Sequence, residues 1–296
     1  MRANVIAVLS ALTLLSACGK DTQPESAPLP MPTGPAAVKA DPTASAAPAP
    51  KAEAPKKTPR KPKLPKDFES LLAELRKTCA VKDVPQDNVS MKEAAHQEAE
   101  CSRRKMVADL DAVLLPLKSS DPARFSQLMK EQAVWNRYVK SRCWVHEELQ
   151  WLDLTTGQRD DGTMRSYAYI GCISEATAER TFYARALANK DPGAVEKRVK
   201  AREKLGTRDE PILAELLTKA QGFEKSPPKV EPGMVEAEWK KIVEETKASQ
   251  DGAKELATMT CEGWKELGEK LGDKRTCEAS MRLYYLAQGS WEEEPK

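Results

Sequence analysis

The stretch that decides the fold is QAVWNRYVKSRC, residues 132–143, which is followed after a loop by CISEATAERTFYARAL, residues 172–187. In the first stretch, Trp135, Tyr138 and Val139 recur at steps of three and four residues, the spacing of one face of an α-helix. In the second stretch, the same steps place apolar residues and Cys172 on one stripe. Both stretches therefore predict amphipathic helices.

The segments outside these two helices favour helices as well. Ser90 and Glu93 form a capping-box pattern, which predicts the start of a helix that runs toward Pro116. Asp-Pro pairs at 121–122 and 191–192 predict two further helix starts, with proline in the first turn.

Glycine and proline mark the expected breaks. Gly206 is predicted to end the helix that starts after Asp191, because glycine accepts the left-handed conformation of a C-cap. A short helix is expected after Pro211, then a proline-rich break at 226–233, and helical spacing again from Met234. No stretch alternates convincingly between apolar and polar residues, so the sequence predicts an all-α helical bundle.

The N-terminus is typical of a bacterial lipoprotein. Arg2 precedes an apolar run at 5–15, about half the length needed to span a bilayer. That run leads into LSAC, residues 15–18, which matches a lipobox. We expect a signal peptide over 1–18, with Cys18 as the lipid attachment site and membrane anchor. Gly19, where no aspartate follows the cysteine, favours the outer membrane over other parts of the bacterial cell envelope.

Residues 19–66 are rich in proline and alanine and contain no aromatic residue. Such a segment cannot bury enough apolar surface to offset the entropy of ordering it, so we expect a disordered tether. Its last part, residues 51–66, is strongly basic. Two interpretations stay open: a solvated spacer, which we favour, or weak contact with peptidoglycan or another anionic polymer of the envelope.

The remaining charge is asymmetric. The chain of 296 residues has a net charge of +2, but the excess of bases lies in the tether, and residues 67–296 are net acidic. A net-acidic folded part argues against nucleic acid as a partner. We expect one helical domain at 67–207 and an acidic helical extension at 208–296. Residues 277–286 resemble part of the second motif, so the extension is alternatively a degenerate repeat.

The cysteines besides Cys18 are even in number, as expected for a disulfide framework in an exported protein. Fifteen connectivities are formally open, and pairing of neighbours in sequence would staple one helix pair each. The predicted pairs are Cys79–Cys101, Cys143–Cys172 and Cys261–Cys277. Neither histidine has the spacing of a zinc site, so no metal ion and no other cofactor is indicated.

These residues resemble the lysozyme inhibitor LprI-type domain. The family pattern combines a Q-x-x-W-x-x-Y-x-x-x-x-C helix, a G-[ST] loop and a C-x(4)-T-x-x-R-x(6)-L helix. The positions that carry the resemblance are Gln132, Trp135, Tyr138, Cys143, Cys172, Thr177, Arg180 and Leu187, with Gly162-Thr163 in the loop. Cys101 and Leu110 extend the match upstream, whereas Asp111 and Leu114 stand where the family usually has Asn and Tyr. The resemblance implies this fold and binding to a lysozyme-type enzyme.

The residue types and spacing of this motif indicate a mainly structural role. Trp135 and Tyr138 share a helix face and are expected in the core. Arg180 lies on the apolar stripe of its helix, where an unpaired charge is costly. We therefore expect a carboxylate partner, Asp109 or Asp111. Thr177 is expected to donate to a carbonyl of the preceding turn.

Two function classes follow. The chain has none of the common hydrolase, zincin, phosphate-loop or dinucleotide motifs, so an enzyme is not expected. The first class is an inhibitor of a lysozyme-type muramidase, held at the envelope by its lipid. The second is a structural or accessory lipoprotein that binds another envelope protein. For the first class, the candidate partner-binding loop spans 153–167 and carries Arg159, Asp160, Asp161 and Arg165.

Overall fold

The computed structural model describes residues 61–160, 162, 165–229 and 234–289. Within these ranges the chain forms α1 (Phe68–Cys79), α2 (Asn88–Ser120), α3 (Pro122–Trp151), α4 (Arg165–Asn189), α5 (Pro192–Lys225), α6 (Glu236–Gly263), α7 (Lys265–Leu271) and α8 (Lys274–Leu286). The only β pairing there is an isolated bridge between Leu152 and Arg159. The all-α prediction is confirmed. The predicted signal peptide and Cys18 lie outside the described residues.

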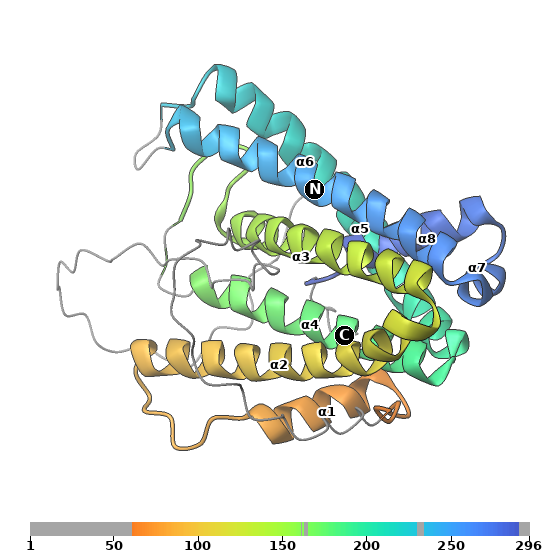
Figure 1. The fold of residues 1–296 in the computed structure, drawn as a ribbon. Coiled ribbons are helices and arrows are strands. Elements are labelled where there is room, and N and C mark those ends of the chain that lie inside the picture. Colours follow the sequence, from red (N-terminus) through yellow and green to blue (C-terminus); the bar gives the residue numbers. More distant parts are fainter. Residues whose placement is uncertain (1–60, 161, 163–164, 230–233, 290–296) are drawn as a thin grey trace, which may run out of the picture. The chain divides into compact units, whose positions relative to one another are not determined.

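The helices of the compact unit Lys56–Lys296 pack in a chain of neighbours. Figure 1 shows α1, α2, α4, α3 and α6 following one another from the bottom to the top of the view. The most extensive pairings are α3 with α6 and α2 with α4, while α8 packs on both α5 and α6. One large core results, with fully buried side chains that include Tyr138, Trp239 and Tyr285.

Aspartates set most of the helix starts. The carboxylates of Asp67, Asp87, Asp121, Asp191 and Asp273 each accept a hydrogen bond from the backbone N–H three residues later, at 2.7–3.0 Å. These bonds satisfy N–H groups that have no partner inside the helix. The predicted Asp-Pro starts of α3 and α5 are confirmed. The Ser90 capping box is not, because Asp87 is the N-cap of α2 and the N–H of Ser90 is its donor.

Two expected breaks lie inside helices. α2 continues through Pro116 to Ser120, and α5 runs unbroken through Gly206 and Pro211. Gly206 does not end a helix. Its lack of a side chain instead allows α5 to pack closely against α8. A Cβ atom at this position would overlap the backbone carbonyl of Leu283 in α8. The expected domain boundary at 207/208 therefore falls in the middle of α5, and the C-terminal helices complete the same core.

The expected tether also ends earlier than residue 66. Leu64 packs against the core, and the carbonyl of Pro62 accepts a hydrogen bond of 2.9 Å from Asn189 at the end of α4. The guanidinium of Arg185 lies 3.5 Å from the Lys63 carbonyl. Residues 61–66 thus belong to the folded unit.

The three disulfides have the predicted pairing. Cys79–Cys101 joins α1 to α2, Cys143–Cys172 joins α3 to α4, and Cys261–Cys277 joins α6 to α8. Each links neighbours in sequence, with Cα–Cα distances of 5.5, 5.4 and 6.1 Å respectively. Constraining the unfolded chain in this way stabilises each helix pair by roughly 3 kcal/mol.

The carbonyls at the C-terminal end of α8 are held by side chains from other helices. The Tyr138 hydroxyl donates to the Tyr285 carbonyl, Arg142 donates to the Leu286 carbonyl at 2.8 and 3.1 Å, and Arg202 donates to the Ala287 carbonyl. Donors, especially charged ones, are favourable at this negative end of the helix dipole.

The chain after α8 is also tightly packed. Gly289 has φ +81 and leaves no room for a Cβ atom beside the sulfur of Cys172. The end of α8 and residues 287–289 are therefore part of the core around the Cys143–Cys172 bridge.

Candidate functional site

The family motif lies at the interface of α3 and α4. Trp135 and Tyr138 are buried on α3, as predicted, and Cys143 is joined to Cys172 on α4. Leu187 is half-buried and packs against the same core. The motif thus provides packing between two helices and offers little of its surface to a partner.

Arg180 is fully enclosed and has a carboxylate partner, but a different one from those predicted. Its guanidinium contacts Glu131 at 2.7 Å and Gln132 Oε1 at 2.8 Å, and it lies 4.8 Å from the centre of the Tyr183 ring. Burial is the largest single effect and opposes the charge, but the charge and hydrogen bond of Glu131, together with smaller effects of Tyr285 and Tyr183, raise the pKa of Arg180. Asp109 instead pairs with Arg185 at 2.6 Å.

Asp111 is exposed on α2 and is not the partner either. One signal for Glu131 was present in the sequence: by helical spacing, Glu131 lies on the same face of α3 as Trp135 and Tyr138. Thr177 is buried, and its carbonyl accepts a 2.7 Å bond from the Thr181 hydroxyl. The expected side-chain bond to the preceding turn is therefore made by Thr181; none from Thr177 is found among the described residues.

More buried ion pairs join α4 to the C-terminal helices. Glu179 accepts hydrogen bonds of 2.9 Å from Arg198 on α5 and from the Tyr284 hydroxyl on α8. Glu175 lies 2.6 Å from Arg202, and burial raises the pKa of this carboxyl to about 7. These contacts fix α4 onto α5 and α8. The buried charged residues Glu175 and Glu179 of α4 thus have partners within the protein.

Residues 153–160, the first part of the candidate loop between α3 and α4, are held by their own polar contacts. The Asp153 carboxylate accepts from the Thr155 N–H at 2.7 Å and from the Thr156 hydroxyl at 2.9 Å, and Gly157 has φ +73. A Cβ atom on Gly157 would lie 3.2 Å from Trp239 of α6. The loop is therefore pinned against the C-terminal helices.

The two arginines of this loop do not supply exposed charge. Arg159 pairs with Glu238 on α6 at 2.8 Å. Arg165 starts α4 and contacts Glu147 at 2.9 Å as well as Glu148. Burial raises the pKa of both glutamates, and the positive charge of Arg165 counteracts it.

Of the predicted loop charges, Asp160 is exposed and Asp161 lies outside the described residues. The exposed surface of the loop is thus neutral to acidic. Its exposed residues in the described part are Asp153, Thr155, Thr156, Gln158 and Asp160.

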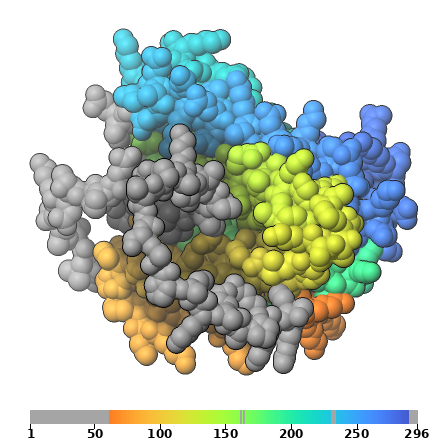
Figure 2. Space-filling model, in the orientation of Figure 1, coloured from red at the N-terminus to blue at the C-terminus, as the bar shows by residue number. Residues whose placement is uncertain are grey.

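A second candidate site, besides the loop, is a groove between α3 and α6. It has a volume of about 420 Å³ and lies between Val134, Arg137, Tyr138 and Ser141 of α3 and Glu244, Glu245, Ala248, Asp251, Gly252 and Glu255 of α6. Figure 2 shows the surface of α6, in blue, bordering that of α3, in yellow-green. Four carboxylates and one guanidinium line it. The sequence revealed the acidic excess after residue 208 but not its position across from α3.

Another hollow of about 460 Å³ lies among α1, α2, α4 and α5, where Phe68 and Leu72 meet Arg198 and Arg202. Both arginines are engaged by glutamates of α4. No group of three potential metal ligands converges within the described ranges. In the same ranges, no helix is both long and apolar enough to cross a bilayer.

Residues 79–183 match the model of the family described as Lysozyme inhibitor LprI. The matched segment starts at Cys79, contains α2, α3 and two of the disulfides, and ends in α4 before Leu187. No curated protein and no solved structure matches the chain. The helices α2 and α3 and two of the cysteine pairs thus lie in a segment, residues 79–183, that is similar to the LprI lysozyme inhibitor family.

Proposed function

We propose that this chain is an envelope-anchored lipoprotein that binds and inhibits a lysozyme-type muramidase. The observation that carries the proposal is the match of residues 79–183 to a family of lysozyme inhibitors. Muramidases of the lysozyme type are typically cationic. The folded part of this chain is net acidic. Opposite charges steer association and make it sensitive to salt.

The ordered loop between α3 and α4 supports the proposal physically. Because it is pinned by the Asp153 turn and by the Arg159–Glu238 pair, docking it into a cleft costs less conformational entropy than docking a free loop. Asp160, with its exposed carboxylate, is the loop charge best placed to contact the enzyme. Arg159 and Arg165 contribute by shaping the loop.

The test is a titration of muramidase activity on peptidoglycan with the purified full-length chain. We expect inhibition that weakens as salt increases. Asp160→Lys should raise the inhibition constant several-fold, whereas Asp111→Lys, an equal charge change at an exposed site on α2, should leave it within twofold. Equal effects of both variants would remove the loop from the proposal and keep the inhibition.

The competing function is an accessory envelope lipoprotein that binds a different protein of the envelope. It is favoured by one observation: the motif residues are buried, so they support the fold without determining a particular partner. Absence of inhibition at tens of micromolar, where the binding free energy falls below roughly 7 kcal/mol, would favour this second function.

Anchoring is tested separately. The LSAC sequence at 15–18 leads us to propose a lipid on Cys18 and an outer-membrane location. Cys18→Ser should abolish processing at this site. The lipidated form should then be absent from the membrane fraction. An unchanged gel mobility and an unchanged membrane fraction would exclude lipidation at Cys18.

A further inference from the structure

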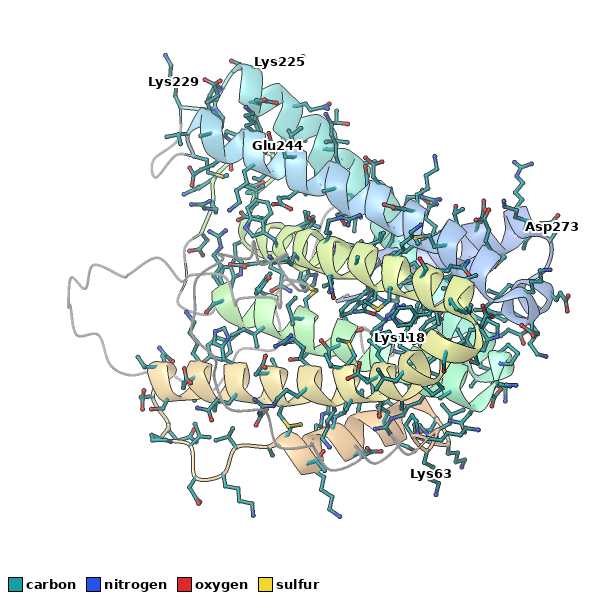
Figure 3. The ribbon with its side chains drawn as sticks, viewed as in Figure 1. Lys63, Lys118, Lys225, Lys229, Glu244 and Asp273 are labelled. Carbon is teal, nitrogen blue, oxygen red and sulfur yellow. A yellow bond between two sulfur atoms is a disulfide. The ribbon has the colours of Figure 1, made fainter. Side chains whose placement is uncertain are left out.

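We propose that the groove between α3 and α6 holds a lysine or arginine side chain of the bound muramidase. This inference rests on the proposed function and extends it to a second contact beside the loop. Glu244, labelled in Figure 3, marks the α6 side of the groove.

The α6 side of the groove includes two small residues. Ala248 and Gly252 of α6 lie opposite Ser141 and Tyr138 of α3. A Cβ atom on Gly252 would be 3.0 Å from the Cβ of Tyr138, so the two helices are already in contact at this point. The volume of about 420 Å³ falls within the ~300–1,000 Å³ typical of small-ligand sites. It can accommodate one long side chain.

The charge of the lining selects a cation. Arg137 lies 3.9 Å from Glu255, and both side chains are more than half exposed, so this pair is weak and easily exchanged. Glu244, Glu245 and Asp251 make no ion pair or hydrogen bond within the described ranges. Three carboxylates therefore face the groove without a cationic partner in the part of the chain that the structure describes.

Ser141 provides an independent indication of a ligand. Its side chain is buried, with only 8% of the residue exposed, and it lines the groove. Its hydroxyl makes no hydrogen bond to any described residue, whereas the Thr181 hydroxyl on α4 and the Thr218 hydroxyl on α5 donate to the carbonyl four residues earlier. The Ser141 oxygen is not among the sealed polar atoms that lack a partner in the described part of the chain, so it is open to the groove. An ammonium or guanidinium in the groove would donate to this oxygen.

The geometry favours a protein side chain over a metal ion. The carboxylates are spread along α6 from residue 244 to 255, and the described part of the chain contains no cluster of three ligands that could close around one ion. A guanidinium or ammonium on a flexible stem needs no such convergence.

The loop and the groove belong to one face of the molecule. Glu238, which holds Arg159 of the loop, and Glu245, which lines the groove, are seven residues apart and therefore on the same side of α6. The rise between them is about 10 Å. An enzyme docked on the loop can thus reach the groove with a neighbouring basic side chain.

The experiment measures binding of the full-length chain to a cationic lysozyme-type muramidase at 0.15 M salt by calorimetry. The groove variant combines Glu244→Gln, Glu245→Gln and Asp251→Asn. Its matched control combines Glu215→Gln, Glu266→Gln and Glu269→Gln, which removes the same charge from exposed sites on α5 and α7. We expect the groove variant to weaken binding at least tenfold and the control less than threefold. Thermal unfolding checks that both variants are folded.

A second pair of variants fills the groove instead of neutralising it. Ala248→Lys places a cation in the groove, and Ala214→Lys places one at an exposed position of α5. The first should weaken binding as strongly as the triple groove variant, and the second should not. Equal losses for groove and control variants would overturn the inference while the inhibition itself stands.

A third experiment, with a small arginine peptide, tests the groove independently of the proposed function. The peptide acetyl-Gly-Arg-Gly-amide is titrated into the chain and its contacts are followed by NMR. If no muramidase binds, the proposed function fails; saturable peptide binding that Ala248→Lys abolishes would then still support a basic side chain in this groove. Absence of saturable binding, or binding unchanged by Ala248→Lys, would overturn it.

Discussion

Replacing Gly206 with alanine should destabilise the protein, although alanine is the better helix former. In a helix interior, alanine is favoured over glycine by ~0.8–1 kcal/mol. At position 206 this gain is opposed by overlap with the backbone of Leu283, whose Cα would lie 2.8 Å from the new Cβ. Because backbone cannot rotate away as a side chain can, α5 and α8 must move apart.

The cost follows from what that movement disturbs. Overpacking of a tight interface typically costs ~1–3 kcal/mol. The same shift stretches the bond between Glu203 and Ser280, now 2.5 Å, and the bond from Arg202 to the Ala287 carbonyl. Each such bond contributes ~0.5–1.5 kcal/mol. With the helix gain subtracted, Gly206→Ala should lower the free energy of unfolding by about 2 kcal/mol.

The control is in the same helix. Gly222 has nothing within 4 Å of an added Cβ and is exposed, so Gly222→Ala should stabilise by about 0.5 kcal/mol. Urea unfolding of both variants, with the disulfides intact, measures the difference as a shift in midpoint at constant slope. If Gly206→Ala were as stable as Gly222→Ala, the close contact of α5 and α8 would be refuted.

Three further changes test the interior. Arg180→Met should cost ~3–5 kcal/mol because it leaves Glu131 charged and buried, and adding Glu131→Leu should restore most of the loss; a double variant as unstable as the single one would contradict this. Burial, with a smaller effect from the charge of Arg142, lowers the pKa of His146 from 6.5 to about 4. The folded state therefore favours the neutral imidazole. This preference contributes about 2–3 kcal/mol to the free energy of unfolding above pH 6.5, and the contribution is lost as the pH falls toward 4. His146→Gln should flatten the dependence of urea stability on pH over this interval, and an unchanged profile would exclude the histidine. Removal of the Cys261–Cys277 bridge by serine at both positions should cost ~2–4 kcal/mol in thermal unfolding, and an unaltered melting temperature would argue against it.

The features predictable from sequence were those set by local chemistry. Asp-Pro pairs located the starts of α3 and α5, because proline and the aspartate cap act within one turn. Apolar spacing placed Trp135 and Tyr138 in the core. The prediction that cysteines pair with their neighbours in sequence, each pair stapling two helices, was also confirmed.

The features that sequence missed depend on distant partners. Gly206 carried the local signal of a helix end, but its lack of a side chain serves contact with Leu283 on α8. The partner of Arg180 could not be chosen among several acids until α3 and α4 were placed side by side, which brought Glu131 closest. Likewise, Arg159 gave no indication that Glu238 on α6 would engage it, so its charge was expected at the surface.

The capture of the α8 carbonyls has a consequence for the order of events during synthesis. The matched segment ends at residue 183, yet the carbonyls that accept hydrogen bonds from Tyr138 and Arg142 belong to residues 285 and 286. Until those residues have been made, Tyr138 and Arg142 lack these acceptors. At ~5–20 residues per second, the roughly 100 intervening residues take about 5–20 s to synthesise. During this time the segment 79–183 lacks the C-terminal helix that completes its core.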